Sequence, residues 1–230
     1  MPVSQAHKAD LLLLVVPLLA AISWMFSKEA VLAMPPLLFM SLRFLLAASL
    51  LAMVAHHQLR RLSPRQLFRC ARVGTVFGIA MSCWVMGLAV GEHVGEGAFL
   101  TSLGVVLVPV IARVIFAEPV PGSTWLALPV AAAGLALLSL EHGLHLEAGQ
   151  LFFVAAATIF ALYFNLNPRA ANTLTTPGPN GQCIEHPRTP ALALTTIVLA
   201  VVGLLTGLLS ALFEPWHSAA ANATPQLALW

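Results

Sequence analysis

The sequence predicts an all-α integral membrane protein, a polytopic bundle of about seven transmembrane helices. Two observations support this fold class. Of the 230 residues, 59% are hydrophobic and only 9% are charged, whereas soluble domains carry roughly a quarter charged residues. The apolar residues also form long blocks, and a helix of about 20 apolar residues crosses roughly 30 Å of hydrocarbon. The chain has too little polar surface for a soluble domain, so its predicted solvent is lipid.

Seven blocks of the sequence are long enough to cross a membrane, and each is a predicted helix. Their approximate bounds are 11–27, 34–55, 73–91, 97–117, 123–140, 149–166 and 191–213. The long connection 167–190 is rich in proline and glycine, which predicts a flexible polar linker.

The charges of the connecting loops predict how the chain is oriented. Loops that stay in the cytoplasm carry an excess of lysine and arginine. The loops on the side of Lys8 hold Arg60, Arg61, Arg65, Arg69, Arg72, Arg169 and Arg188. The loops on the other side hold Glu29, Glu92, Glu96, Glu141, Glu147 and Glu214, with Lys28 as their one basic residue. Seven crossings of the inner (plasma) membrane, with the N-terminus cytoplasmic and the C-terminus outside, explain this alternation.

A series of short motifs follows the predicted helices in order. They are Trp24 with Lys28, Pro36 through Arg43-Phe44, Leu107-Val108-Pro109, Glu118-Pro119, the small-residue segment Trp125 to Leu140 with Gly134, and Gly149 to Phe164. In the order and spacing of these motifs, the chain resembles EamA-type permeases of the drug/metabolite transporter superfamily. The resemblance covers nearly the whole chain.

The resemblance implies a fold of ten helices built from two five-helix repeats, the second inverted, as is typical of alternating access. Residues 1–146 then form the first repeat. Residues 147–230 form part of the second, because only two of its helices follow, separated by the linker 167–190. The implied function is secondary transport of a small metabolite or drug-like solute, with efflux as the expected direction.

An alternative interpretation follows from the two-helix second repeat. The chain would then be a truncated or degenerate non-transporting membrane protein, or a helical subunit. In that case a homodimer or the helices of a partner chain would complete the bundle. The lipid bilayer is a predicted partner under both interpretations.

Arg43 is the most informative single residue, because a charge inside an apolar helix costs roughly 2.5–3.5 kcal/mol on insertion scales. In the functional interpretation, its guanidinium faces the interior of the bundle and binds an anionic group of the substrate. In the structural interpretation, Arg43 extends toward the outer interface and pairs with Glu29.

Four further residues are candidates for the substrate pathway or for coupling. Trp24 and Trp84 could form apolar walls of a substrate site. Aromatic rings near helix ends are also interface anchors, and this alternative applies to Trp24 and to Tyr163. Pro109 removes a helical hydrogen bond and predicts either a hinge or a packing kink. Glu118, ahead of Pro119, is a possible coupling residue or simply a helix end.

The remaining patterns argue against other functions. The His and Glu residues near 92–96 and 141–147 match no metal-site spacing, and the three cysteines form no CxxC pair. The chain has no nucleotide-binding loop and no nucleophile or HExxH motif, so the sequence predicts no cofactor, no enzyme and no bound ATP. Its net charge of +2 gives no indication of nucleic-acid binding. Gly74-Gly78 and Gly203-Gly207 match GxxxG and predict close helix packing.

Overall fold

The computed structural model describes residues 3–91, 94–140, 148–172, 174–177, 183–186 and 188–214. Its elements are α1 Val3–Ala33, α2 Pro36–Leu59, α3 Pro64–Val90, α4 Val94–Phe116, α5 Gly122–Leu140, α6 Ala148–Ala171, β1 Leu174–Pro177, β2 Cys183–His186 and α7 Ala191–Phe213. Six helices in the described part of the chain, all except α5, are long and apolar enough to span a membrane. The polytopic all-α fold class is confirmed.

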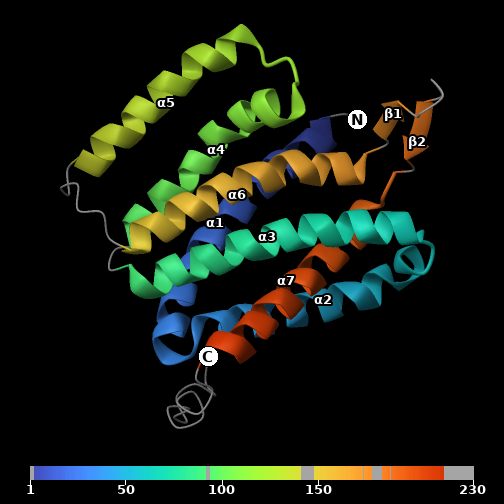
Figure 1. Ribbon diagram of the computed structural model, residues 1–230, viewed down its shortest axis with the longest axis horizontal. Coiled ribbons are helices and arrows are strands. Elements are labelled where there is room, and N and C mark those ends of the chain that lie inside the picture. Colours follow the sequence, from blue (N-terminus) through green and yellow to red (C-terminus); the bar gives the residue numbers. More distant parts are fainter. Residues whose placement is uncertain are drawn as a thin grey trace.

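The helices form a row of neighbours that does not follow their order in the sequence (Figure 1). α2 packs on α7, α7 on α3, α3 on α6, α6 on α4, and α4 on α5. The last two helices are thus inserted among the first four. The buried core lies along this row and includes Met40, Trp84, Phe153 and Val202.

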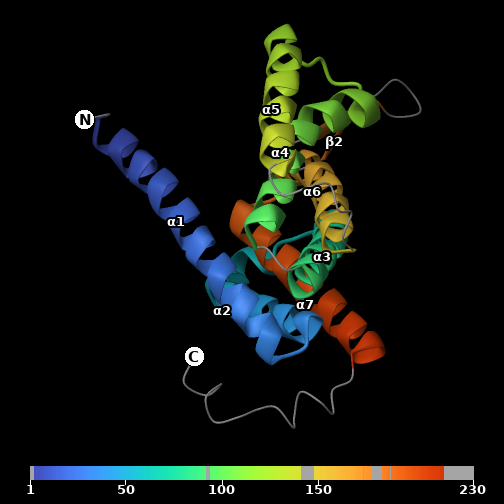
Figure 2. The same cartoon turned by 90° about the vertical axis from the view of Figure 1, so that its left-hand side faces the viewer.

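α1 is attached to the bundle differently from the other helices. Its contacts with α2 and α3 are few, and the end that carries the N-terminus projects away from the bundle (Figure 2). Large apolar side chains between Val15 and Phe26 are exposed. The attachment of α1 therefore depends on a small number of specific side-chain contacts near its other end.

Both GxxxG segments lie where helices approach closely, as the sequence predicts. A Cβ atom added to Gly74 of α3 would lie 3.2 Å from Cα of Val198 in α7. One added to Gly203 of α7 would lie 2.9 Å from the backbone nitrogen of Leu45 in α2. Small residues at these positions therefore allow α7 to pack against two neighbours at once.

Several helix boundaries extend beyond the predicted apolar blocks. α3 begins at Pro64, nine residues before the predicted start at 73. Its first turn is a capping box, in which the Ser63 and Gln66 side chains each accept a hydrogen bond from the other residue's backbone amide. α6 likewise continues to Ala171 rather than ending near 166. Hydropathy detects only the apolar part of a helix, and α3 and α6 extend beyond their apolar parts.

The connection predicted at 167–190 as a flexible polar linker begins later in the structure and contains two paired strands. Residues 167–171 belong to α6, and β1 pairs antiparallel with β2, with Thr176 opposite Ile184. The amide of Thr189 donates to the carbonyl of Ala171 and so joins the two ends of the connection between α6 and α7. Described residues of the segment thus form backbone hydrogen bonds with one another, although its prolines and glycines predict a loop.

Candidate functional site

The two ends of the bundle can be told apart by their charged residues. At one end, here named the basic end, lie the start of α3, the end of α6 and the start of α7. They are joined because Arg69 donates to the carbonyl of Arg169 (2.6 Å) and Gln66 donates to that of Arg188 (3.1 Å). The end of α4 also lies here, because Glu118 pairs with Arg169. Alternate loops thus meet at the same end, as the predicted order of crossings requires.

Arg43 lies between α1 and α2 and is bound by two serine hydroxyls of α1. Its Nη1 donates to Oγ of Ser27 (3.0 Å), and its Nη2 donates to Oγ of Ser23 (2.6 Å). Ser27 is buried, whereas the Arg43 side chain remains more than one-third exposed. The interpretation in which Arg43 pairs with Glu29 is therefore wrong.

The guanidinium of Arg43 keeps an unneutralised charge within the described part of the chain. Its two partners are neutral hydroxyl groups, and no described carboxylate forms an ion pair with it. A guanidinium has five N–H donors in a planar fork that matches a carboxylate or phosphate. Two contacts to serine orient this fork and leave further donors available to an anion.

Trp24 of α1 and Trp84 of α3 come together in the structure. Their ring centroids are 4.6 Å apart and the rings meet edge to face, which is a favourable geometry for an aromatic pair. Trp24 follows Ser23 directly on α1, and Trp84 is a buried residue of α3. The structure thus brings together two of the four residues predicted to form the substrate pathway, and Arg43 is joined to the same helix α1 through Ser23 and Ser27.

Tyr163 lies elsewhere, in an aromatic cluster between α3 and α6. Its ring stacks on that of Phe77 with centroids 4.4 Å apart, and Phe77 also contacts Phe44 edge to face. The ring packs between helices because α3 and α6 approach closely along their length. Its role as an interface anchor stays a prediction.

Pro109 lies within α4, and the carbonyl just before it has a partner on α6. The side-chain amide of Asn165 donates to the carbonyl of Val108 (3.0 Å) and to that of Ala161 (2.8 Å). Polar contacts of this kind join helices within a bilayer. Pro109, the candidate flexible point in α4, is therefore next to a hydrogen bond with α6. The tryptophan pair lies between two other helices, α1 and α3.

Two side chains cap helix ends opposite the basic end. Nζ of Lys28 donates to the carbonyls of Leu88 (2.9 Å) and Gly91 (2.7 Å), where α3 ends. The carboxylate of Glu214 accepts from the amides of Leu37 (2.8 Å) and Leu38 (3.1 Å), where α2 begins. A cation at a helix C-terminus and an anion at an N-terminus are both favoured by the helix dipole. Lys28, the one Lys or Arg in the loops predicted to lie outside, therefore has a structural role at this end of the bundle.

Glu118 takes part in a matching contact at the basic end. Its carboxylate forms an ion pair with Arg169, whose guanidinium also lies 3.4 Å from the ring centroid of Phe116. Both charged side chains are partly exposed, and exposed ion pairs contribute about 0–1 kcal/mol. The pair therefore contributes little to the stability of the bundle, although it joins the ends of α4 and α6.

The predicted acidic outer rim lies mainly outside the described residues. This applies to Glu92, His93, Glu141, His142, His145 and Glu147, and to the side chain of Glu96. Among the side chains that the structure does describe, no group of three or more His, Cys, Asp or Glu residues could hold a metal ion.

Comparison with known proteins identifies the family. A family model described as the EamA-like transporter family matches residues 7–140, more than half of the chain. The chain belongs to the EamA-like transporter family. This EamA-family chain is thus a multi-pass membrane protein of a family of transporters. No curated protein and no solved structure matches it.

Sequence reasoning missed three residues that the structure places at important contacts. Ser23 and Ser27 hold Arg43, and Asn165 joins α6 to α4. Each left a signal in the sequence. The two serines are four residues apart on one face of a helix, one of them directly before Lys28, and Asn165 is an amide within an apolar block.

Proposed function

We propose that this EamA-family chain carries a small metabolite or drug-like solute bearing an anionic group across the inner membrane, in the direction of efflux, by alternating access. The observation that supports the proposal is the Arg43 guanidinium, held by two serines and not neutralised by a described carboxylate. An ionisable group inside a membrane bundle is costly, and transport pathways are a common reason to retain one. The Trp24–Trp84 pair, which includes a residue of the same helix α1 that holds Arg43, offers an apolar surface for the rest of the solute.

The contacts at the two ends of the bundle suggest how the site changes its exposure. Lys28 and Glu214 fasten helix ends opposite the basic end, and the Glu118–Arg169 pair fastens α4 to α6 at the basic end. Each contact is made by one charged side chain that reaches a neighbouring helix. Release at one end while the other stays fastened would expose Arg43 to one side at a time, with Pro109 as the flexible point in α4 and Glu118 as the group that couples protonation to release.

A release assay with the purified chain tests this proposal. Liposomes containing the protein are loaded with a small-molecule extract of cells, and the solutes that leave are identified by mass spectrometry. We expect a small set of anionic solutes to leave faster than from protein-free liposomes, while cationic and neutral solutes of similar size do not. Equal release from both kinds of liposome would contradict the proposal.

A further inference from the structure

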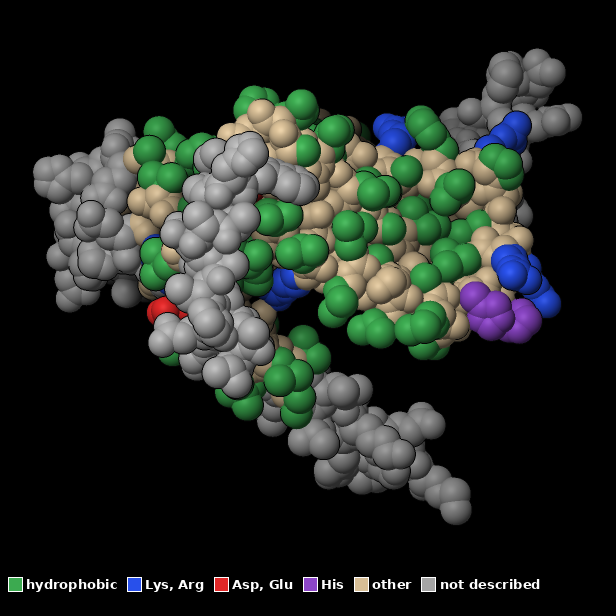
Figure 3. All heavy atoms as spheres, turned by 90° about the horizontal axis from the view of Figure 1, so that it is seen from below, with side chains coloured by type: hydrophobic (Ala, Val, Ile, Leu, Met, Phe, Trp, Pro, Cys, Tyr) green, Lys and Arg blue, Asp and Glu red, His purple; other side chains and the backbone are tan. Residues whose placement is uncertain are grey.

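The turn between α2 and α3 presents a cluster of exposed basic side chains. His56 and His57 form the last turn of α2, and their ring centroids lie 4.1 Å apart. Arg60 and Arg61 follow in the turn itself, and Arg65 lies in the first turn of α3. All five side chains are exposed. They are named here the turn cluster, and Figure 3 shows the two histidines beside basic side chains at one extremity of the molecule.

The turn is compact, so these side chains are held near one another. The amide of Arg60 donates to the carbonyl of His56, that of Arg61 donates to Gln58, and the Ser63–Gln66 capping box begins the next helix directly. Backbone and capping contacts therefore fix the turn without using any guanidinium. The positive groups remain available to a ligand.

The turn cluster has no acidic partner within the described part of the chain. Between Glu29 and Glu92 the sequence contains no Asp or Glu at all. Arg69 and Arg169, also at the basic end, are engaged with helix-end carbonyls and with Glu118, respectively. The arginines of the turn cluster form no such contact and no ion pair with a described residue. Their guanidinium groups are therefore available to an anion from outside the chain.

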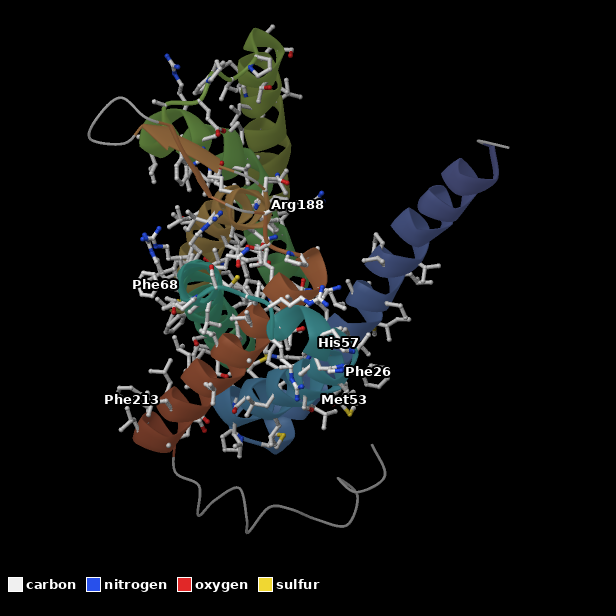
Figure 4. The ribbon with its side chains drawn as sticks, turned by 90° about the vertical axis from the view of Figure 1, so that its right-hand side faces the viewer. Phe26, Met53, His57, Phe68, Arg188 and Phe213 are labelled. Atoms are coloured by element: carbon white, nitrogen blue, oxygen red, sulfur yellow. The ribbon has the colours of Figure 1, made fainter. Side chains whose placement is uncertain are left out.

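Apolar side chains next to the turn cluster place it at the surface of the hydrocarbon. Met53 and Val54, one turn before the histidines, are 67% and 72% exposed, and Phe68, one turn after Arg65, is 66% exposed. Figure 4 shows Met53 and Phe68 directed away from the helices that carry them. In a helix that spans a membrane, such side chains face lipid tails. The guanidinium groups then lie at the depth of the lipid headgroups.

We propose that the turn cluster binds the phosphate of an anionic phospholipid headgroup, such as phosphatidylglycerol, in the leaflet that the basic end faces. Guanidinium groups bind phosphate oxygens through paired, charge-assisted hydrogen bonds. Basic residues next to a membrane-spanning helix attract anionic lipids, each by roughly 1 kcal/mol. Lipid is the favoured source of the phosphate because the apolar flank adjoins the acyl chains of the same molecule. This inference does not depend on which solute the chain carries.

A binding measurement on the full chain in non-ionic detergent tests the proposal. The probe is fluorescent phosphatidylglycerol, displaced by unlabelled phosphatidylglycerol or phosphatidylcholine. The double variant Arg60→Gln/Arg61→Gln is expected to bind phosphatidylglycerol roughly tenfold to thirtyfold more weakly than the parent chain. Its fold should be unchanged, which circular dichroism and gel filtration check, because both side chains are exposed and neither guanidinium forms a hydrogen bond or ion pair with a described residue.

The matched control is Arg113→Gln/Arg188→Gln, which removes the same charge from two other exposed arginines, at the end of α4 and just before α7. We expect the control to retain the parent's affinity. The proposal is overturned if the control loses as much affinity as the test variant, or if phosphatidylcholine displaces the probe as well as phosphatidylglycerol does. Displacement by soluble glycerol phosphate at the same concentration would identify a site for free phosphate and would also overturn it.

Discussion

Arg43→Ala is expected to abolish release of the anionic solutes, by a factor on the order of 100, while leaving the amount of folded protein in the membrane unchanged. Removing one partner of a desolvated charge pair costs about 2–5 kcal/mol, and the variant would leave the anion without its guanidinium. The protein should still insert, because alanine is easier to place in a membrane than arginine. The measurement is the initial rate of release from liposomes at equal protein content.

Two companion variants distinguish a binding role for Arg43 from a general effect of charge. Arg43→Lys keeps the charge but replaces the planar fork held by Ser23 and Ser27 with a single ammonium group. We expect weaker apparent solute affinity with a smaller loss of maximal rate. Arg72→Ala removes an exposed arginine of α3 and should release solutes like the parent chain. Unchanged release from Arg43→Ala would remove Arg43 from the pathway.

Gly203→Ala is expected to destabilise the bundle by about 1–3 kcal/mol, the usual range for overpacking a close contact. The added Cβ would lie 2.7 Å from Cγ and 2.9 Å from the backbone nitrogen of Leu45. Rotating the leucine side chain relieves only the first clash, so α7 and α2 must separate. The hydrogen bond from Ser41 to the carbonyl of Gly203 (2.9 Å) would lengthen as they do.

The measurement for this variant is thermal unfolding in detergent, with Gly122→Ala as the matched control. Gly122 begins α5 and has no atom within 4 Å of an added Cβ. The control should unfold at or slightly above the temperature of the parent chain, since alanine favours helix more than glycine does. If Gly203→Ala also unfolded at the parent's temperature, that result would contradict the close packing of α7 on α2.

The number and order of the helices could be predicted from the sequence because lipid imposes a simple requirement. Every segment inside the hydrocarbon must satisfy its own backbone, so a long apolar block implies a helix. The start of α3 at Pro64 was missed because hydropathy detects only the part of a helix that lies in the hydrocarbon. The first turns of α3 lie beyond the apolar block, and their start is set by the local Ser63–Gln66 capping box.

The candidate site was predictable only one residue at a time. Arg43 is conspicuous as a charge in an apolar helix, and Trp84 as an aromatic residue near the middle of one. Their juxtaposition with α1 depends on which helices pack together, and hydropathy carries little information about helix neighbours. The capping role of Glu214 shows the same limit, because its partners Leu37 and Leu38 lie far away in the sequence.

The side of the membrane that each end of the bundle faces tests the account most directly. Reporter fusions are placed after Arg65, in the turn cluster, and after Glu147, ahead of α6. The proposed topology predicts a cytoplasmic signal from the first and an external signal from the second. Signals from the same compartment would contradict the proposed crossings, and with them the transport pathway and the lipid site.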